Sequence, residues 1–222
     1  MPLGALHKTG ESPRMNMRDV YARKSAAYKL TKRAFDFTAS GLALLVLSPL
    51  MAATAIAIVV ESGRPVIYAA PRVGKDNKPF TMYKFRSMHQ GAEEQQSILC
   101  KTGQRDAAFK MAHDPRITQV GRFIRKYFID ELPQLFNVVK GDMSLVGPRA
   151  IQQTRPYTPY EAQRLVVQPG LTCYWQVSGN MRMPWEEWIE LDLDYIEDMS
   201  VACDLSIIKK TFGVVVRGEG GY

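Results

Sequence analysis

The sequence is poor in the residues that build disulfide frameworks and metal cages. Among its 222 residues are three cysteines and three histidines. Cys100, Cys173 and Cys203 are far apart, odd in number and without CxxC spacing. This argues against a disulfide framework or a zinc site and favours a reducing compartment. Because the histidines are scattered as well, we expect no metal site built on histidine or cysteine side chains.

The chain also lacks the pattern of a cleavable signal peptide. Its first apolar run begins only after Arg33, and no small-residue cleavage site follows a short apolar core. Residues 1–23 are largely polar, and proline and glycine recur among them. We therefore expect residues 1–23 to form a mobile polar tail.

Acidic residues are outnumbered, since 29 Lys and Arg against 22 Asp and Glu give a net charge of +7. Such an excess favours polyanionic partners, whether nucleic acid, anionic lipid headgroups or phosphorylated substrates. The charge alone does not separate these classes.

One long run carries no charge at all. Phe37 to Val60 reads FTASGLALLVLSPLMAATAIAIVV, which is 24 residues. As a straight helix it would be roughly 36 Å long, enough to cross a bilayer. A single spanning helix is one interpretation, and a buried core helix of a soluble protein is another.

Two features favour a third interpretation, a helix–break–helix hairpin that enters the membrane and returns to the same side. Ser48 and Pro49 lie at the centre of the run, and an internal proline costs about 3 kcal/mol in a regular helix. Basic residues flank both ends, and basic flanks are retained on the cytoplasmic side. A re-entrant hairpin keeps both flanks there, with Asp36 expected to meet a nearby arginine at the interface. The flanking residues are Lys24, Lys29, Lys32, Arg33, Arg64, Arg72 and Lys75.

The next segment has the pattern of a β-hairpin. VIYAAPRVGKDNKPFTMYKFRSM contains two extended runs around a turn rich in Gly, Asp, Asn and Pro. Alternation in the second run places Lys84 and Arg86 on one face, where they would project together as anion ligands do. The alternative is a solvated edge strand that carries two protective cations, and the spacing does not separate the two.

Two adjacent carboxylates interrupt a helical pattern in the middle of this basic chain. In YFIDELPQLFN, Asp130 and Glu131 come shortly before Pro133, which fits the first turn of a new helix that Gly141 closes. One interpretation is a helix cap, with Asp130 paired to Lys126 four residues earlier.

The other interpretation is a phosphate site. Arg122, Arg125, Lys126 and Arg149 lie near the two acids in sequence and could together receive a diphosphate. Mg²⁺ typically binds through one or two carboxylates plus substrate phosphates. An ionised aspartate can also attack phosphorus directly and form a covalent intermediate.

Turns bearing arginine and aromatic residues follow. GDMSLVGPRA ends in a Gly-Pro turn that fixes Arg149, as suits bidentate phosphate recognition. Tyr174 and Trp175 could stack on a nucleobase, lie at a membrane interface or pack in the core. The chain then reads as two helices, and the second, over about residues 204–217, could pack as core or lie on a bilayer as an amphipathic anchor.

Four ordered segments resemble the bacterial sugar transferases, specifically the monotopic phosphoglycosyl transferases that act on polyprenol phosphate. They are KRAFDFTASGLALLVLSP, RVGKDNKPFTMYKFRSM, DPRITQVGRFIRKYFIDELPQLFNVVKGDMSLVGPR, and PGLTCYWQVSG with LDLDYIEDMSVACDLSIIKKT. Together they cover the chain from about Lys32 onwards. The lack of a preceding multi-span region resembles the short members of the family that initiate exopolysaccharide synthesis.

The resemblance implies transfer of a sugar 1-phosphate from a UDP-sugar to undecaprenyl phosphate, with release of UMP. It implies that Asp130 forms a covalent phosphosugar–aspartyl intermediate and that Asp130 and Glu131 hold Mg²⁺. Neighbouring cations are expected to lower the pKa of Asp130 and keep it ionised. The Ser48-Pro49 break maps onto the turn of a re-entrant helix. The residues expected to bind substrate are Lys84, Arg86, Arg125, Arg149, Gln176 and Arg182.

The sequence departs from the family pattern at three positions. Gly-Pro-Arg-Pro ends here in Ala150, Cys173 replaces a glycine, and Asn180 replaces an arginine for which Arg182 would substitute. The last two departures lie where nucleotide or sugar contacts are expected, so they bear on the donor more than on the chemistry. The sugar and the polymer stay open.

The expected fold is α+β and mainly helical. Residues 24–64 would form the basic-flanked re-entrant hairpin, and residues 65–222 a cytoplasmic catalytic domain with a small β-hairpin and surface amphipathic helices. The expected location is the bacterial inner membrane, with anionic lipids as further partners, homo-oligomerisation open and nucleic-acid binding not expected. The rival hypothesis is a non-catalytic membrane-anchored scaffold that binds anionic lipids.

Overall fold

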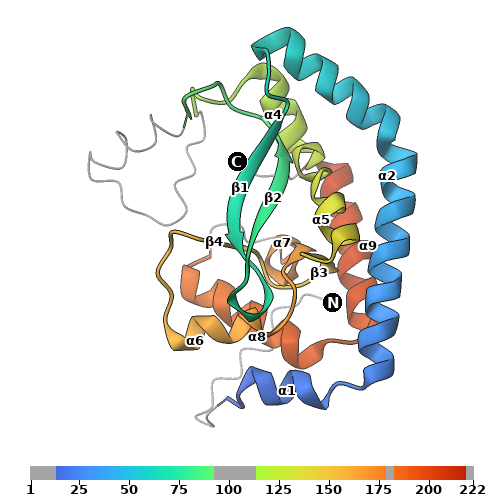
Figure 1. Cartoon of the computed structure of the whole chain (residues 1–222), viewed down its shortest axis with the longest axis vertical. Coiled ribbons are helices and arrows are strands. Elements are labelled where there is room, and N and C mark those ends of the chain that lie inside the picture. The colour runs from blue at the N-terminus through green and yellow to red at the C-terminus, as the bar shows by residue number, and fades with distance from the viewer. Residues whose placement is uncertain (1–13, 93–113, 179–182, 219–222) are drawn as a thin grey trace.

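The computed structural model describes residues 14–92, 114–178 and 183–218. In this part the fold is α+β and mainly helical, as the sequence predicts (Figure 1). The helices are α1 (Met17–Arg23), α2 (Ala26–Ser62), α4 (Gln119–Lys126), α5 (Gln134–Lys140), α6 (Pro159–Ala162), α7 (Tyr174–Val177), α8 (Trp185–Asp198) and α9 (Val201–Arg217). Single 3-10 turns form η1 (Lys75–Asn77), η2 (Ile129–Glu131) and η3 (Gln163–Val166). The strands are β1 (Ile67–Val73), β2 (Pro79–Phe85), β3 (Ser144–Val146), β4 (Ile151–Gln152) and β5 (Gly170–Thr172).

α2 is one helix of 37 residues, and Pro49 lies inside it. A proline cannot donate to the carbonyl four residues back, and here the Ser48 hydroxyl donates to that carbonyl, of Leu45, at 2.8 Å. Figure 1 shows α2 running along one side of the domain and bending over its upper end. The predicted break between two helices is therefore corrected to a bend within one continuous helix.

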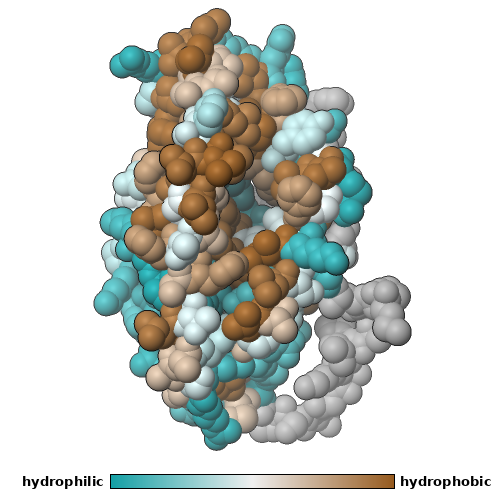
Figure 2. All heavy atoms as spheres, turned by 90° about the vertical axis from the view of Figure 1, so that its right-hand side faces the viewer, coloured by the Kyte–Doolittle hydropathy of each residue, from teal (hydrophilic) through white to brown (hydrophobic). Residues whose placement is uncertain are grey.

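Most of the apolar part of α2 is exposed. Leu45 and Val46 are each 72% exposed, and only 11% of the most apolar 18-residue window is buried. Figure 2 shows apolar side chains gathered on the face of the molecule that carries α2. The buried-core interpretation of this run does not fit. By length and composition alone, α2 could cross a membrane.

The predicted β-hairpin is confirmed. β1 and β2 pair antiparallel with Ala70 opposite Met82, and β4 joins the other edge of β1 to give the order β2-β1-β4. A second, parallel sheet consists of β3 and β5, with Val146 opposite Thr172. The loop that follows β3 is thereby placed beside the N-terminal end of α7.

The largest apolar core lies among α1, α8, α9 and η3. Leu193 and Ile196 are fully buried there, and so is Met17 of α1. Arg14 also pairs with Asp194 at 2.5 Å. Residues 1–13 of the predicted mobile tail lie outside the described residues, but residues 14–23 are ordered because α1 contributes an apolar side chain to this core.

α9 buries one face and exposes apolar residues on the other. Ile207 and Val214 are buried, whereas Phe212 is 71% and Val216 64% exposed. Core packing therefore explains the buried face of α9, whereas its exposed apolar face is available to contact lipid or another apolar surface.

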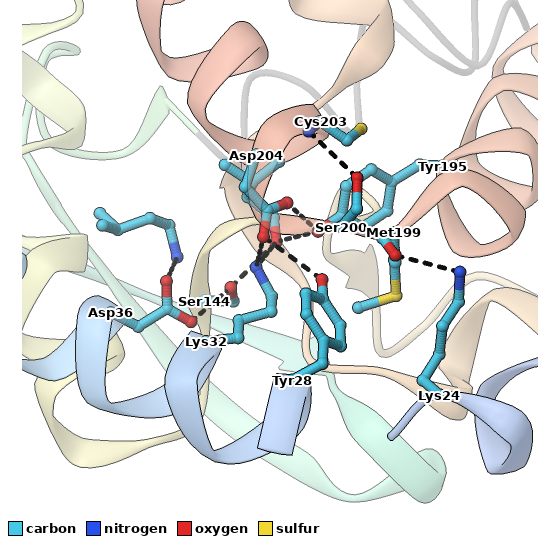
Figure 3. Close-up of polar contacts among 12 residues, drawn as sticks. Lys24, Tyr28, Lys32, Asp36, Ser144, Tyr195, Met199, Ser200, Cys203 and Asp204 are labelled. Carbon is cyan, nitrogen blue, oxygen red and sulfur yellow. Dashed lines mark hydrogen bonds and ion pairs between the residues drawn. The ribbon is translucent and has the colours of Figure 1, made fainter. Parts of the chain in front are cut away.

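A buried polar network joins α2 to α8 and α9 (Figure 3). Lys32 Nζ lies 3.0 Å from Asp204 Oδ2, and their side chains are 12% and 8% exposed. The hydroxyls of Tyr28 and Tyr195 donate to the same carboxylate at 3.3 and 2.8 Å. Asp204 thus has three donors on two other helices, which fixes α9 against α2.

Two further residues of α2, Asp36 and Arg33, attach it to β3 and α5. Asp36 accepts hydrogen bonds from the Ser144 hydroxyl at 2.7 Å and the Leu145 amide at 3.2 Å, rather than meeting an arginine as expected. One turn earlier, the Arg33 guanidinium donates to the carbonyls of Val138 and Val139 at 2.6 and 2.7 Å. These carbonyls belong to the last turn of α5, where a cation is favoured by the helix dipole.

Candidate active site

Asp130 and Glu131 lie on η2, the single turn between α4 and α5. The turn begins after Phe128, whose φ of 56° is left-handed and uncommon for a bulky side chain. Pro133 is the N-cap of α5 and Gly141, at φ 96°, its C-cap, which confirms both predicted helix ends. The capping interpretation of Asp130 is not supported, because Pro133 occupies the cap position and Asp130 lies three residues earlier.

Asp130 is buried, with 9% exposure. Burial raises its pKa to about 6; Lys84 and Arg125 act against this and the charge of Glu131 adds to it. The neighbouring cations do lower this pKa, as expected, but the loss of hydration outweighs their attraction and the net shift is upward. At neutral pH the group is mostly ionised and poorly hydrated.

Glu131 has the opposite behaviour. Burial by itself would raise its pKa, but Lys84, Arg149 and Arg72 together outweigh burial and lower it. Lys84 Nζ donates to Glu131 Oε1 at 2.6 Å. Two adjacent carboxylates with pKa values displaced in opposite directions are typical of catalytic pairs with divided roles.

β2 carries Lys84 to the dyad, and Asn137 holds β2 against α5. The fully buried Asn137 side chain accepts from the Tyr83 amide at 3.0 Å and donates to the Thr81 carbonyl at 2.7 Å. The sequence reasoning missed this residue. Its signal is a polar residue within the apolar periodicity of α5, between the buried Leu135 and Val138.

Arg86 does not join Lys84, so the predicted pair is corrected. β2 ends at Phe85, and alternation does not continue to the next position. The Arg86 guanidinium instead donates to the carbonyls of Ser62 and Gly63 at 2.9 and 2.6 Å, at the C-terminal end of α2. The solvated-edge alternative does not fit either, because Arg86 is 8% exposed and Lys84 is ion-paired.

The other candidate residues lie in different surroundings. Arg125 is in the last turn of α4, near enough to Asp130 to act on its pKa. The Arg149 guanidinium lies 4.9 Å from the ring centroid of Trp175. The Gln176 side chain is 7% exposed, and its Oε1 accepts a hydrogen bond from the Cys173 thiol. Arg182 lies outside the described residues.

The aromatic pair after β5 is mainly a core element. Trp175 is 3% exposed and stacks on Trp188 at 4.4 Å between ring centroids. Of the three environments expected for Trp175, the core is the one observed. The Arg149 guanidinium, whose charge acts on Glu131, lies over the Trp175 ring.

Arg72 is a second residue that the sequence reasoning missed. Its pKa is lowered by burial and then by the charge of Arg149, and its Nε is buried without a hydrogen-bond partner in the described part of the chain. Glu131 is the carboxylate that attracts it. Alternation along β1 from the buried Ala70 would have pointed to this position. Two arginines beside one carboxylate leave positive charge that suits an anionic ligand.

The dyad was also predicted to hold Mg²⁺. Within residues 14–92, 114–178 and 183–218, no cluster of three His, Cys, Asp or Glu side chains forms a metal cage. The adjacent carboxylates of Asp130 and Glu131 fit a Mg²⁺ ion that completes its shell with phosphate oxygens and water. They do not fit an ion held by protein ligands alone.

Comparison with known proteins points to one family. The family model described as bacterial sugar transferase matches residues 27–218. The undecaprenyl-phosphate galactose phosphotransferase of Salmonella typhimurium is 40% identical over 208 residues, which cover 90% of this chain and 43% of that protein. The undecaprenyl-phosphate glucose phosphotransferase of Komagataeibacter xylinus is 43% identical over 193 residues, covering 81% of this chain and 34% of that protein.

The matched lengths differ among relatives. This chain spans less than half the length of both phosphotransferases. The exopolysaccharide production protein ExoY of Rhizobium meliloti is 34% identical over 200 residues, which cover 87% of this chain and 88% of that protein. The segment that the family model matches, residues 27–218, includes the dyad, α8 and α9.

Proposed function

The chain belongs to the bacterial sugar transferase family, and from this premise we propose that it is a membrane-associated phosphoglycosyl transferase. It transfers a sugar 1-phosphate from a UDP-sugar to undecaprenyl phosphate, releases UMP, and so begins the synthesis of a bacterial polysaccharide. The names of the matched phosphotransferases support the acceptor, and they differ in the sugar. The observation that carries the proposal is the buried Asp130–Glu131 dyad, set among Lys84, Arg72, Arg125 and Arg149.

The reaction proceeds in two displacements. A carboxylate oxygen of Asp130 attacks the phosphorus that bears the sugar, and the bond from that phosphorus to the UMP oxygen breaks with its electron pair. A phosphate oxygen of undecaprenyl phosphate then attacks the same phosphorus and displaces the Asp130 carboxylate. Covalent catalysis of this kind divides one difficult transfer into two easier ones.

The surrounding residues suit these steps. The ion pair with Lys84 keeps Glu131 ionised, so that Glu131 can hold a cation next to Asp130, the nucleophile. Arg72 and Arg149 would bind the anionic phosphates of the donor. Asp130 and Glu131 would hold Mg²⁺, which would neutralise the diphosphate and the charge that develops on the leaving phosphate.

The exposed apolar surface suits a lipid-linked acceptor. α2 exposes Leu45 and Val46, while α4, α5 and α9 expose Phe123, Phe136 and Phe212. These side chains would enter one leaflet of the inner membrane, with the bend at Pro49 as the deepest point of a re-entrant α2 and the domain facing the cytoplasm. Lys126, Lys209 and Lys210, on the helices that carry these phenylalanines, suit anionic lipid headgroups.

The decisive experiment looks for the covalent adduct. Purified protein in detergent is incubated with Mg²⁺ and UDP-sugars, first without undecaprenyl phosphate and then with it. We expect about one UMP per chain released without acceptor, and a phosphosugar on Asp130 detected by mass spectrometry of its peptide. Asp130→Asn should abolish both signals, while Asp19→Asn in the exposed first turn of α1 should leave them unchanged.

The alternatives give different results. A one-step displacement would release UMP only with acceptor present and would leave no adduct on Asp130. A non-catalytic scaffold would release none with any UDP-sugar while still binding vesicles that contain anionic lipids. Topology has its own test: cysteines placed singly beyond Gly63 and in residues 14–23 should react with impermeant reagent from the cytoplasmic side only, whereas a spanning α2 would separate them.

A further inference from the structure

The turn that presents Arg149 is clamped by backbone contacts. The Gly147 amide donates to the Thr172 carbonyl at 3.1 Å, and the Gly170 amide donates to the Pro148 carbonyl at 2.8 Å. A Cβ on Gly170 would lie 2.1 Å from the Gly147 nitrogen, so the two backbones are in direct contact and only glycine fits. The turn is thus fixed against β5 up to Pro148.

Its upstream flank is fixed by side chains as well. The Val146 carbonyl accepts a hydrogen bond from Lys32 Nζ at 3.1 Å. The hydroxyls of Tyr195 and Ser144, whose single protons are shared with the carboxylates of Asp204 and Asp36, each lie 2.9 Å from the same carbonyl. The chain therefore enters the turn in a conformation defined by α2 and α8. What is left to define is the main chain of Arg149 itself.

A buried ion pair contacts that main chain. Arg164 of η3 and Asp192 of α8 are paired, and they are 2% and 1% exposed. Arg164 Nη2 also donates to the Arg149 carbonyl at 2.5 Å. On the other side, the Arg149 amide and guanidinium both lie near enough to Asp192 to counter the pKa rise that burial causes.

Stability alone does not account for such a pair. Removing two charges from water costs several kcal/mol per ion, and well-packed apolar residues of similar volume are often equally stable or more so. Arg164 Nε and Nη1 are buried with no hydrogen-bond partner among the residues that the structure describes, which adds to this cost. What the pair supplies and an apolar pair cannot is a fixed donor for the Arg149 carbonyl and a fixed negative charge near its amide.

We propose that Arg164 and Asp192 are positioning residues for Arg149. They hold its main chain so that its guanidinium stays over the Trp175 ring and beside Glu131, in place for a phosphate of the donor. This step rests on the function proposed above. Neither residue touches the substrate, and both act through Arg149.

The test replaces the pair by apolar residues of similar shape, Arg164→Met with Asp192→Leu. We expect a melting temperature at or above that of the unchanged protein. We expect kcat/KM for the UDP-sugar to fall about ten- to a hundredfold, the loss typical of a reacting group that is slightly misplaced. Repeated in an Arg149→Gln background, the same replacement should cost less than about twofold, because groups that act as a unit are non-additive.

A matched control lies on the same helix. Arg14→Met with Asp194→Leu removes an ion pair from the outer face of α8 and should change kcat/KM less than about twofold. If the buried apolar pair does not fold, Arg164→Lys takes its place, since it keeps the charge but its shorter side chain does not reach the position of Nη2, the atom that contacts both Asp192 and the Arg149 carbonyl. Arg164→Lys should likewise lower kcat/KM strongly in the otherwise unchanged protein and only slightly in the Arg149→Gln background.

Hydrogen exchange of the peptide over residues 146–151 gives a readout that does not depend on turnover. Its exchange should quicken in the variant while that of α9 stays unchanged. Equal losses of kcat/KM in both backgrounds, or unchanged exchange in this peptide, would overturn the proposal. If the unchanged protein released no UMP from any UDP-sugar, the proposed function would fail, and the exchange result would still decide the positioning role.

Discussion

Replacing Lys32 by methionine tests whether the network of Figure 3 holds α2 onto the domain. The change removes the cation that is paired with Asp204 and the donor to the Val146 carbonyl, and keeps most of the apolar stem. Asp204 is then left buried with hydroxyl donors from Tyr28 and Tyr195. A buried carboxylate that loses its counter-ion must either stay charged at a cost or take up a proton.

The expected size follows from the burial of the pair. Removing one partner of a buried ion pair costs about 3–5 kcal/mol, and the two remaining hydroxyl donors place this case near the lower end, at about 3 kcal/mol. For a chain of this size about 1 kcal/mol moves the melting temperature by roughly 2–4 °C. We therefore expect Lys32→Met to melt about 6–12 °C lower in the same detergent.

Lys29 provides the matched control, one turn earlier on the same helix. It is partly exposed and lies over the Tyr21 ring at 4.6 Å, so Lys29→Met should cost only about 0.5–1 kcal/mol. Differential scanning fluorimetry or circular dichroism measures both variants side by side. Equal melting temperatures for the two would refute the reasoning, because the buried pair would then contribute no more than a surface cation.

Three further predictions concern the dyad and the bend. kcat/KM for UMP release, measured from about pH 5 to 8, should fall as the pH drops through about 6, because protonated Asp130 cannot attack. Glu131→Gln should move this fall to lower pH, because it removes a charge that raises the pKa of Asp130. A kcat/KM that does not change with pH would contradict both expectations. Chelation with EDTA should stop UMP release and added Mg²⁺ should restore it, whereas turnover insensitive to chelator would show that the dyad works without a cation. Ser48→Ala should lower the melting temperature by the equivalent of about 1 kcal/mol, since it leaves the Leu45 carbonyl without its donor; Ser48→Thr keeps the hydroxyl, and an equal loss in both would sink this explanation.

Features that depend on near neighbours in sequence could be predicted well. The ends of α5 follow from Pro133 and Gly141, because one fixes φ for a helix start and the other accepts a left-handed φ at its end. The hairpin of β1 and β2 follows from alternation and turn residues. The sequence predicts a break at Pro49 because the cost of an internal proline leaves out the Ser48 hydroxyl, which supplies the lost donor to the Leu45 carbonyl.

Features that depend on packing could not be predicted. Lys84 and Glu131 are 47 residues apart in sequence, and nothing local indicates that they pair. The raised pKa of Asp130 comes mainly from burial, which only the folded chain defines. Arg86 looked like a partner of Lys84 because alternation was extended one residue past the end of the strand.

The two hydrogen bonds from Arg33 to the end of α5 fix the distance along α2 between the dyad and the bend of the helix. Arg33 is anchored to the helix that follows the dyad, and Pro49, the residue type at which helices bend, lies 16 residues later, so the two points are separated by roughly 24 Å of helix rise. One inserted residue would move the bend by about 1.5 Å and swing the apolar stripe by about 100°. Insertions and deletions between these two positions should therefore be selected against, whereas changes of length should be tolerated in segments that do not set the distance from the dyad to the bend.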